Sequence, residues 1–339
     1  MKLHNNNAAP EILVGERKMS FSTFILKYNP LIIFALLFII STFLSPFFLT
    51  QRNLVNILRQ QSTYIIIAMG LLMPLVSGGI DLSIASVVGL GSILITELVT
   101  MNNMGIIEAI LIAILLSALI GAINGSLIAF LNMPPFIVTL AMSYGVMGLV
   151  FIFSGGANRM LRSDDPLVHA FINFGQNNDP LFGLPWRVYL TIAIVLIFVF
   201  IMKFTTFGRL MTATGSNPTA VNLAGISTKK YRFLAPVISS TLAGFAGIML
   251  TAGQGASSPT TVAGDFTMIA IAGAIIGGAD LGGGKGTAHF TVVGIFIMGI
   301  IQNIMNLSNV PAYPQWVVKA VVIIIAIFLR SFINTRNSK

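Results

Sequence analysis

Long apolar runs recur along this sequence, and they limit the possible folds more than any other feature does. A helix needs about 20 mostly apolar residues to cross the hydrocarbon core of a bilayer. Ten runs in the 339-residue chain fit that requirement. They are residues 30–49, 54–76, 83–100, 105–131, 134–154, 187–206, 232–252, 266–280, 287–307 and 316–333. We therefore predict an all-α, polytopic membrane protein, with about ten helices in one transmembrane domain over residues 30–333.

The charge content agrees with this fold class and excludes others. Only 9% of the residues are charged, whereas a soluble domain carries roughly a quarter. The net charge of +9 does not indicate a nucleic-acid partner, because the basic residues are dispersed at the ends of the apolar runs. The chain has no cysteine and only three scattered histidines, so we expect no disulfide and no metal site. We expect this chain to be surrounded by membrane lipid.

Basic residues also predict the orientation, because Lys and Arg collect on the cytoplasmic side of membrane proteins. With the N-terminus in the cytoplasm, thirteen fall on that side and five on the other. The thirteen are Lys2, Arg17, Lys18, Lys27, Lys203, Arg209, Lys229, Lys230, Arg232, Lys285, Arg330, Arg336 and Lys339. The five are Arg52, Arg59, Arg159, Arg162 and Arg187. We expect a multi-pass protein of the cytoplasmic membrane, with cytoplasmic tails at 1–29 and 334–339 and an extracytoplasmic connection at 155–186.

One polar, basic segment, FGRLMTATGSNPTAVNLAGISTKKYR at 207–232, interrupts the apolar pattern. Asn217 suits a helix cap, Pro218 the first helical position and Gly225 the stop, which predicts a helix at about 218–224. A helix that short is not stable alone in water, so it must dock on something. The apolar side chains available for docking are Ala220, Val221, Leu223 and Ala224. They can fill a groove on a partner or pack back onto this chain.

Small residues recur at the spacing that lets helices pack closely. The pairs are Gly121/Gly125, Gly273/Gly277 and Ala85/Gly89. A short internal echo also pairs SGGIDLS at 77–83 with IGGADLG at 276–282. Glycine-interrupted helices in corresponding halves are typical of a transport pathway. Chance similarity in a glycine-rich chain is the alternative.

No enzymatic site is indicated. The segment GGGKGT at 282–287 is not a phosphate-binding loop, because Ala279 occupies the required glycine and Gly286 the required hydroxyl position. The sequence has no paired carboxylates, metalloprotease motif or nucleophile elbow. We therefore expect no catalytic residue and no cofactor in this chain.

Four polar residues near the spans are candidates for a polar pathway: Asp81, Asn124, Gln302 and Asn303. Asp81 can instead cap the helix that follows it. The amides can instead form hydrogen bonds between helices. Ion-coupled carriers usually bury a charged relay in mid-span, and this chain has little sign of one, which favours another energy source.

Five segments, taken together, carry a family resemblance. They are SGGIDLSIASVVGLGS at 77–92, LIAFLNMPPFIVTLA at 127–141, FGRLMTATGSNPTAVNLAGI at 207–226, IAGAIIGGADLGGGKG at 271–286 and QNIMNLSNVPAYPQWVVKA at 302–320. In this order they resemble the permease subunits of bacterial sugar ABC importers, the group of ribose, xylose and galactose permeases. The resemblance implies the ABC importer permease architecture and import of a monosaccharide, such as ribose, by alternating access.

The resemblance implies that 207–231 is the cytoplasmic coupling loop, which docks in a cleft of a separate ATPase subunit. The residues that carry this role are Gly215, Ser216, Asn217, Pro218, Ala220, Leu223, Gly225 and Ile226. The general importer pattern is Glu-Ala-Ala, three residues, then Gly. This chain departs from that pattern at Thr219 and Val221 and keeps the sugar-permease version better.

The resemblance also implies the partners: an ABC ATPase subunit that hydrolyses the ATP, an extracytoplasmic sugar-binding protein, and a second permease copy or a sister permease. The chain itself is then not an enzyme. The nearest alternative is the same machinery for a nucleoside, an autoinducer or a branched-chain amino acid, and an amino acid would favour charged groups along the path. An ion-coupled secondary carrier and a non-transporting scaffold are further alternatives, and neither needs a coupling loop.

Overall fold

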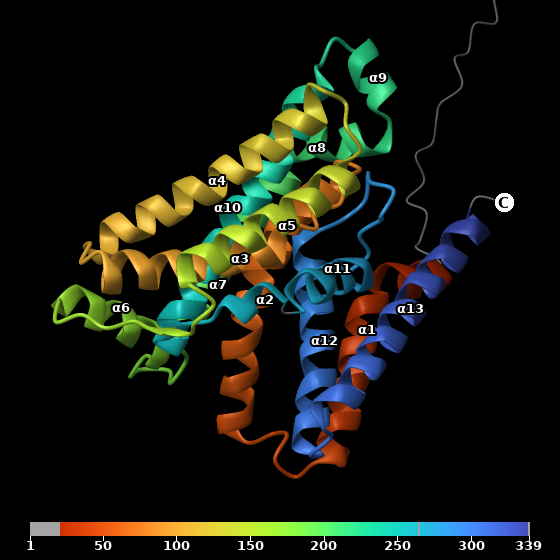
Figure 1. The fold of residues 1–339 in the computed structure, drawn as a ribbon. Helices are drawn as coiled ribbons and strands as arrows, with labels where there is room; N and C mark the ends of the chain where they lie inside the picture. The colour runs from red at the N-terminus through yellow and green to blue at the C-terminus, as the bar shows by residue number, and fades with distance from the viewer. Residues whose placement is uncertain (1–20, 264, 338–339) are drawn as a thin grey trace, which may run out of the picture.

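The computed structural model describes residues 21–263 and 265–337, and this part of the chain is almost entirely helical (Figure 1). Its elements are α1 (Phe21–Leu44), α2 (Gln51–Val76), α3 (Ile84–Thr96), the π-helix η1 (Glu97–Met101), α4 (Ile106–Ala129), α5 (Pro135–Ser154), β1 (Arg159–Met160), α6 (Pro166–Gln176), α7 (Trp186–Phe204), α8 (Thr206–Ser216), α9 (Pro218–Leu223), α10 (Thr228–Gln254), β2 (Ala256–Ser257), the 3-10 helix η2 (Pro259–Ala263), α11 (Phe266–Ile276), α12 (Ala288–Leu307) and α13 (Ala312–Asn337). The predicted all-α class is confirmed. The predicted tails at 1–29 and 334–339 lie partly outside the described residues, since these exclude 1–20 and 338–339.

Each predicted span corresponds to a helix within the described residues. Seven helices there are long and apolar enough to cross a membrane: Ile84–Met101, Ile106–Ala129, Pro135–Ser154, Trp186–Phe204, Thr228–Gln254, Pro259–Ile276 and Ala288–Leu307. Two further apolar helices, Tyr28–Leu44 and Ala312–Phe328, are shorter. The remaining span is α2, whose first half carries Arg59, Gln60 and Gln61 and is therefore less apolar. The predicted polytopic architecture is confirmed.

The helix α3 lies in the core of the molecule. In the span Ile84–Met101, 78% of the most apolar window is buried inside the protein, and α10 packs against α2, α3 and α4. Hydroxyl groups join α3 to its neighbours: Ser86 Oγ lies 2.9 Å from Ser143 Oγ on α5, and Ser92 Oγ lies 2.7 Å from Thr251 Oγ1 on α10. This helix is surrounded by protein over most of its length.

Small residues bring α4 and α10 into backbone contact. A Cβ atom on Gly121 would lie 2.5 Å from the carbonyl oxygen of Pro236, and a Cβ on Gly125 would collide with the carbonyl oxygen of Phe233. The second GxxxG pair, Gly273 in α11 and Gly277 at its cap, meets α12: a Cβ on Gly277 would collide with the carbonyl oxygen of Phe290, and a Cβ on Gly273 would collide with the side chain of Ile295. Both predicted GxxxG pairs are therefore close-packing sites in which a larger residue does not fit.

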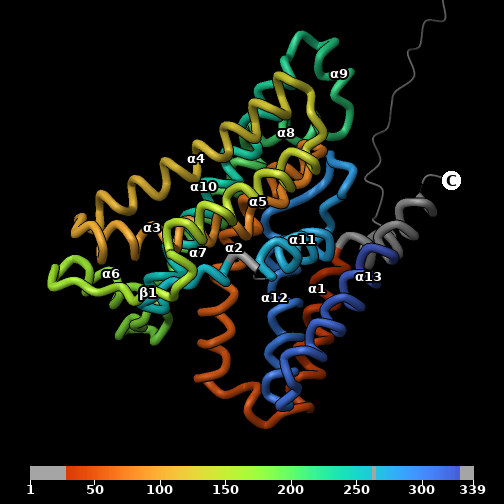
Figure 2. Tube along the Cα trace, in the orientation of Figure 1, coloured from red at the N-terminus to blue at the C-terminus, as the bar shows by residue number. Residues whose placement is uncertain are grey.

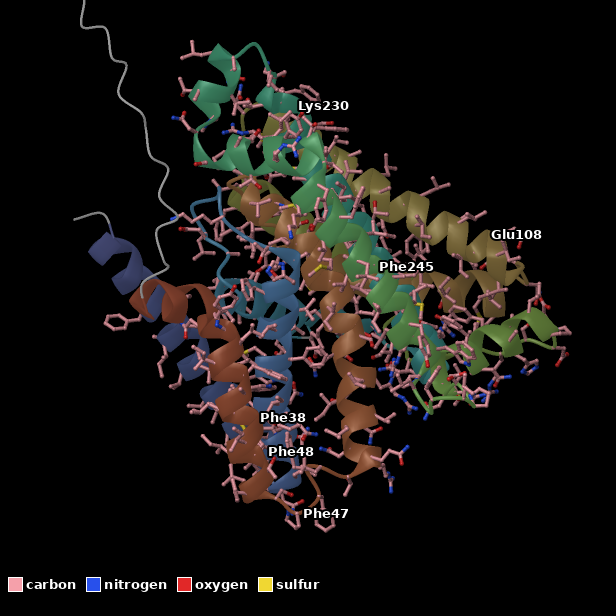
Figure 3. The ribbon with its side chains drawn as sticks, turned by 180° about the vertical axis from the view of Figure 1, so that it is seen from behind. Phe38, Phe47, Phe48, Glu108, Lys230 and Phe245 are labelled. Carbon is pink, nitrogen blue, oxygen red and sulfur yellow. The ribbon has the colours of Figure 1, made fainter. Side chains whose placement is uncertain are left out.

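The two ends of the molecule carry different elements. Figure 1 shows α8, α9 and the connection between α4 and α5 gathered at one end. The elements of the 155–186 connection, β1 and α6, lie away from α9 (Figure 2). In Figure 3, Lys230 lies at the α9 end and Phe47 at the opposite end. β1 is anchored to the segment after α10, because Arg159 pairs with Ser257 across the antiparallel β1–β2 ladder.

Candidate functional site

The predicted short helix at 218–224 is α9, and its N-terminus is capped as the sequence predicts. The N–H of Ala220 donates to Asn217 Oδ1 over 2.9 Å, and Pro218 occupies the first helical position. This cap satisfies one of the free N–H groups at the start of the helix.

The C-terminus of α9 ends in a Schellman motif that also fixes the start of α10. Gly225 has φ +78° and donates its N–H to the carbonyl of Asn222 over 3.0 Å, while Ile226 N–H donates to Val221 over 3.2 Å. Asn222 Oδ1 then accepts from both the N–H and the hydroxyl of Thr228, at 3.2 and 3.1 Å. The predicted stop at Gly225 is confirmed, and Asn222 ties α9 to α10.

One face of α9 is open for docking. Leu223 is 84% exposed, and Ala220 and Ala224 are exposed beside it. Val221 is only 8% exposed, because it packs inward on this chain. Of the two predicted alternatives, Val221 therefore follows packing back onto this chain. Leu223 is the large apolar side chain that α9 presents outward.

The segment before α9 is also helical, which was not predicted from the sequence. Helix α8 starts after Thr205, whose Oγ1 accepts from Gly208 N–H over 3.3 Å. The residues Gly208, Met211 and Thr214 are buried, and this spacing of three residues is typical of one helix face. That signal was present but was obscured by the polar composition of the segment.

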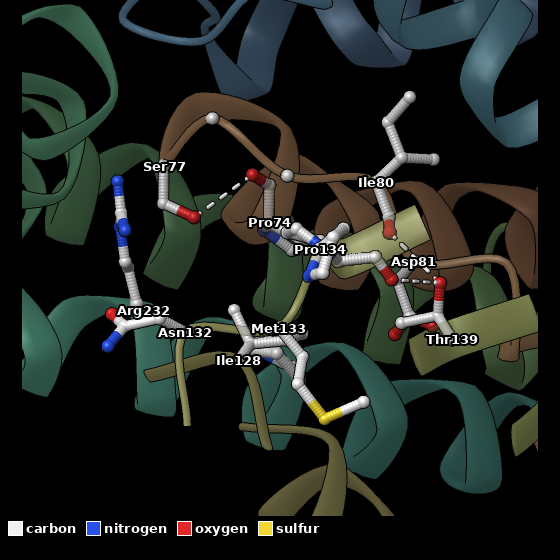
Figure 4. Close-up of a pocket in the computed structure, with 14 residues that line it drawn as sticks. Pro74, Ser77, Ile80, Asp81, Ile128, Asn132, Met133, Pro134, Thr139 and Arg232 are labelled. Atoms are coloured by element: carbon white, nitrogen blue, oxygen red, sulfur yellow. Dashed lines mark hydrogen bonds between the residues drawn. The ribbon is translucent and has the colours of Figure 1, made fainter. Parts of the chain in front are cut away.

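A cavity of about 180 Å³ opens near the same end of the molecule (Figure 4). It is lined by the α2–α3 connection, which includes Ser77, by the α4–α5 connection, which includes Asn132, and by Arg232 on α10. Thr139 on α5 joins two of its walls, because its hydroxyl donates to the carbonyl of Ile80 over 3.1 Å. These four wall residues could not be assigned from the sequence, since their approach depends on tertiary structure.

The structure brings Asp81 and Asn124 together beside this cavity. Asp81 is fully buried, and its Oδ1 accepts from the N–H and the hydroxyl of Ser83, at 2.9 and 2.6 Å. Asn124 Nδ2 donates to the same hydroxyl over 3.2 Å. Ser83 directly precedes α3, so Asp81 stabilises the turn before that helix instead of bonding to the N–H groups of the helix itself. Asp81 also lines the cavity.

The other two candidates lie at the far end of α2. Asn303 on α12 exchanges two amide hydrogen bonds with Asn53, at 3.1 and 2.8 Å, and Gln302 is half-buried next to it. Asn53 is near the start of α2 and Asp81 follows its end, which separates the two sites by roughly 35 Å of helix. The structure therefore does not bring Gln302 and Asn303 to Asp81 and Asn124.

Comparison with known proteins identifies the family. The family described as "Branched-chain amino acid transport system / permease component" matches residues 53–328, from the start of α2 into α13. No solved structure matches the chain.

Three relatives align over nearly the whole chain. The L-arabinose transport system permease protein AraH of Escherichia coli (strain K12) is 33% identical over 305 residues, 89% of each chain. The ribose import permease protein RbsC of Bacillus subtilis (strain 168) is 32% identical over 324 residues, 94% of this chain and 97% of its own. The D-allose transport system permease protein AlsC of Escherichia coli (strain K12) is 32% identical over 320 residues, 94% and 96% of the two chains. The chain therefore belongs to the permease-component family of ABC import systems, in the group that includes the sugar permeases.

Proposed function

We propose that this chain is the membrane subunit of an ATP-driven importer that carries a monosaccharide into the cytoplasm. The observation that carries the proposal is the similarity to arabinose, ribose and allose permeases over at least 89% of this chain. The family description mentions branched-chain amino acids, but these three relatives, which align nearly end to end, are named for sugars. We therefore propose that the transported solute is a pentose or an aldohexose.

The proposed arrangement in the membrane places α9 in the cytoplasm. Lys229 and Lys230 stand exposed at the start of α10, as the positive-inside rule requires of a cytoplasmic end. Both termini are then cytoplasmic, and 155–186 is extracytoplasmic. The ATPase subunit docks on α9 and hydrolyses the ATP, and Leu223 is its apolar contact. A second copy of the chain, or a sister permease, completes the pathway, since symmetric pairing is common in such assemblies.

The proposed pathway uses the four candidate residues at two depths. Asp81 and Asn124 belong to its cytoplasmic part, next to the 180 Å³ cavity. Gln302 and Asn303 belong to its outer part, near the start of α2. A carboxylate can accept several hydrogen bonds from a hydroxyl-rich solute, and an amide can both accept and donate them.

The outer end of α2 offers a basic surface for the soluble sugar-binding protein. A surface pocket of about 500 Å³ there is lined by Arg52 and Arg59, with polar neighbours that include Asn178. Arg59 is held in place because its Nη2 donates to Asn178 Oδ1 over 2.6 Å. Within the described residues, neither ion pair of the structure involves these two arginines. We infer that they receive carboxylates of the binding protein, which would speed encounter and fix its orientation.

Replacing Arg59 with glutamate should therefore weaken capture of the binding protein. A close like-charge contact replaces an attraction, so we expect the concentration of loaded binding protein at half-maximal uptake to rise by about tenfold or more. The measurement is uptake into proteoliposomes as the binding protein is titrated. The Arg59→Lys variant keeps the charge and should stay near the wild type. An unchanged titration for Arg59→Glu would contradict this docking site.

The function itself is tested by uptake of labelled sugars into proteoliposomes that contain this chain, its ATPase subunit and ATP, with the binding protein outside. We expect uptake of one pentose or hexose that requires all of these components. Uptake driven by an ion gradient without ATP would contradict the importer. Competition by a nucleoside or by leucine, but by no sugar, would instead assign the same machinery to that solute.

A further inference from the structure

The two segments of the internal echo fold into the same backbone motif. Gly78 ends α2 with φ +88°, and Gly278 ends α11 with φ +92°. At each end, the N–H of the next residue donates over 2.8 Å to the carbonyl of the third-last helical residue. Both helices therefore end in a Schellman motif, which needs a glycine in the left-handed conformation.

The turns that follow the two helices are also alike. Asp81 Oδ1 accepts the N–H of Ser83 over 2.9 Å, and Asp280 Oδ1 accepts the N–H of Gly282 over 3.0 Å. Aspartates bonded to the backbone two residues on form Asx turns. The echo is thus a repeated structural unit, although the helix-ending glycine falls one position later in the second copy.

The second connection is longer than the first, and its additional residues cross over to the first. The N–H of Gly284 donates to the carbonyl of Val76, the last residue of α2, over 2.9 Å. A Cβ on Gly283 would lie 2.7 Å from the Cα of Gly78. The two connections are therefore in direct backbone contact.

The end of α8 joins the same contact. A Cβ on Gly215 would collide with the carbonyl oxygen of Val76 and would lie 2.7 Å from the backbone nitrogen of Gly284. A Cβ on Gly284 would lie 2.7 Å from the Cα of Ser216. Three segments distant in sequence meet here without side chains between them. We call this contact the glycine junction, and it consists of Gly78, Gly215, Gly283 and Gly284.

The position of the glycine junction links α9 to the cavity. Ser216 and Asn217 connect it directly to α9, and on its other side Gly78 lines the cavity together with Ser77 and Asp81. Close-packed backbone does not compress, so a displacement on one side is passed to the other. We propose that the glycine junction is where the movement of α9 reaches the pathway, with the two connections moving together with the end of α8. This inference rests on the proposed docking of the ATPase subunit on α9.

The first test replaces Gly283 with alanine, which inserts a Cβ atom 2.7 Å from the Cα of Gly78. We expect the variant to bind the ATPase subunit and to hydrolyse ATP, while sugar uptake per ATP falls by about tenfold or more because the contact is overpacked. The matched control is Gly282→Ala in the same connection. A Cβ there would meet only Asp280 Oδ1, at an ordinary 3.5 Å, so its uptake should match the wild type. Wild-type sugar uptake per ATP in Gly283→Ala would overturn the proposal.

A second test keeps all four glycines and therefore does not depend on how that variant folds. Because the chain has no cysteine, spin labels can be placed by single cysteines at three exposed sites: Ser216, Leu281 and Met133. Through the ATP cycle of the complex, the Ser216–Leu281 distance should stay constant and the Ser216–Met133 distance should change. A changing first distance or a constant second distance would overturn the proposal. Failure of the unlabelled wild type to bind its ATPase subunit would instead contradict the proposed function.

Discussion

Replacement of Leu223 with aspartate is expected to abolish ATP-driven uptake by preventing the ATPase subunit from docking. Leu223 is 84% exposed at the tip of α9, and burying a leucine side chain in a partner's groove is worth about 1.5–3 kcal/mol. An aspartate in the same groove would also have to lose its hydration. We therefore expect the dissociation constant of the ATPase subunit to rise by about 100-fold. Titration of the purified subunit against the detergent-solubilised permease measures this directly.

Two controls separate docking from general damage to the protein. Leu223→Met keeps an apolar side chain of similar volume and should bind almost as well as the wild type. Leu181→Asp makes the same change at a leucine that is 77% exposed in the 155–186 connection, and it should leave ATPase binding unaffected. Equal affinity of the wild type and Leu223→Asp would show that α9 is not the docking element.

Replacement of Gly125 with valine is expected to cause a large loss of stability. A Cβ at this position already collides with the carbonyl oxygen of Phe233 and would lie 3.1 Å from its Cα, so valine would push α10 away from α4. Overpacking of this kind costs about 1–3 kcal/mol, and occasionally more. We expect the midpoint of thermal denaturation in detergent to fall by about 5 °C, measured by the loss of monodisperse protein on heating.

The matched control is Gly148→Val on α5. A Cβ on Gly148 has no neighbouring atom within 4 Å in the chain, so the same substitution in another apolar helix should change the midpoint little. Similar losses for both variants would mean that a β-branched side chain in an apolar helix, and not the contact with Phe233, is responsible.

The sequence allowed prediction of those features that depend on neighbouring residues. The helices follow from apolar runs, and the limits of α9 follow from Asn217, Pro218 and Gly225, because caps and stops are local interactions. The GxxxG pairs could also be predicted, since their spacing marks one face of a helix. Helix α8 was missed because its polar residues outweighed the three-residue spacing of its buried face.

Features that depend on distant residues could not be predicted. The four pathway candidates shared only a polar side chain within an apolar segment, and nothing in the sequence indicated that Asn303 would pair with Asn53. Likewise, the echo between 77–83 and 276–282 indicated a repeated unit but not its contact with Gly215. These pairings are set by how the helices pack. The paired residues lie much farther apart in the sequence than the window in which a local pattern can be recognised.

The burial of α3 has a consequence for how the protein is made. Ser92 is paired with Thr251 on α10, and Ser86 with Ser143 on α5, yet α10 begins only at Thr228, long after α3 ends at Thr96. During synthesis from the N-terminus, α3 therefore enters the bilayer before its main partner exists, with its hydroxyls facing lipid or a temporary neighbour. A nascent chain that stops before α10 can place α5 beside its central helix, but it lacks the surface of α10 against which Ser92 is paired.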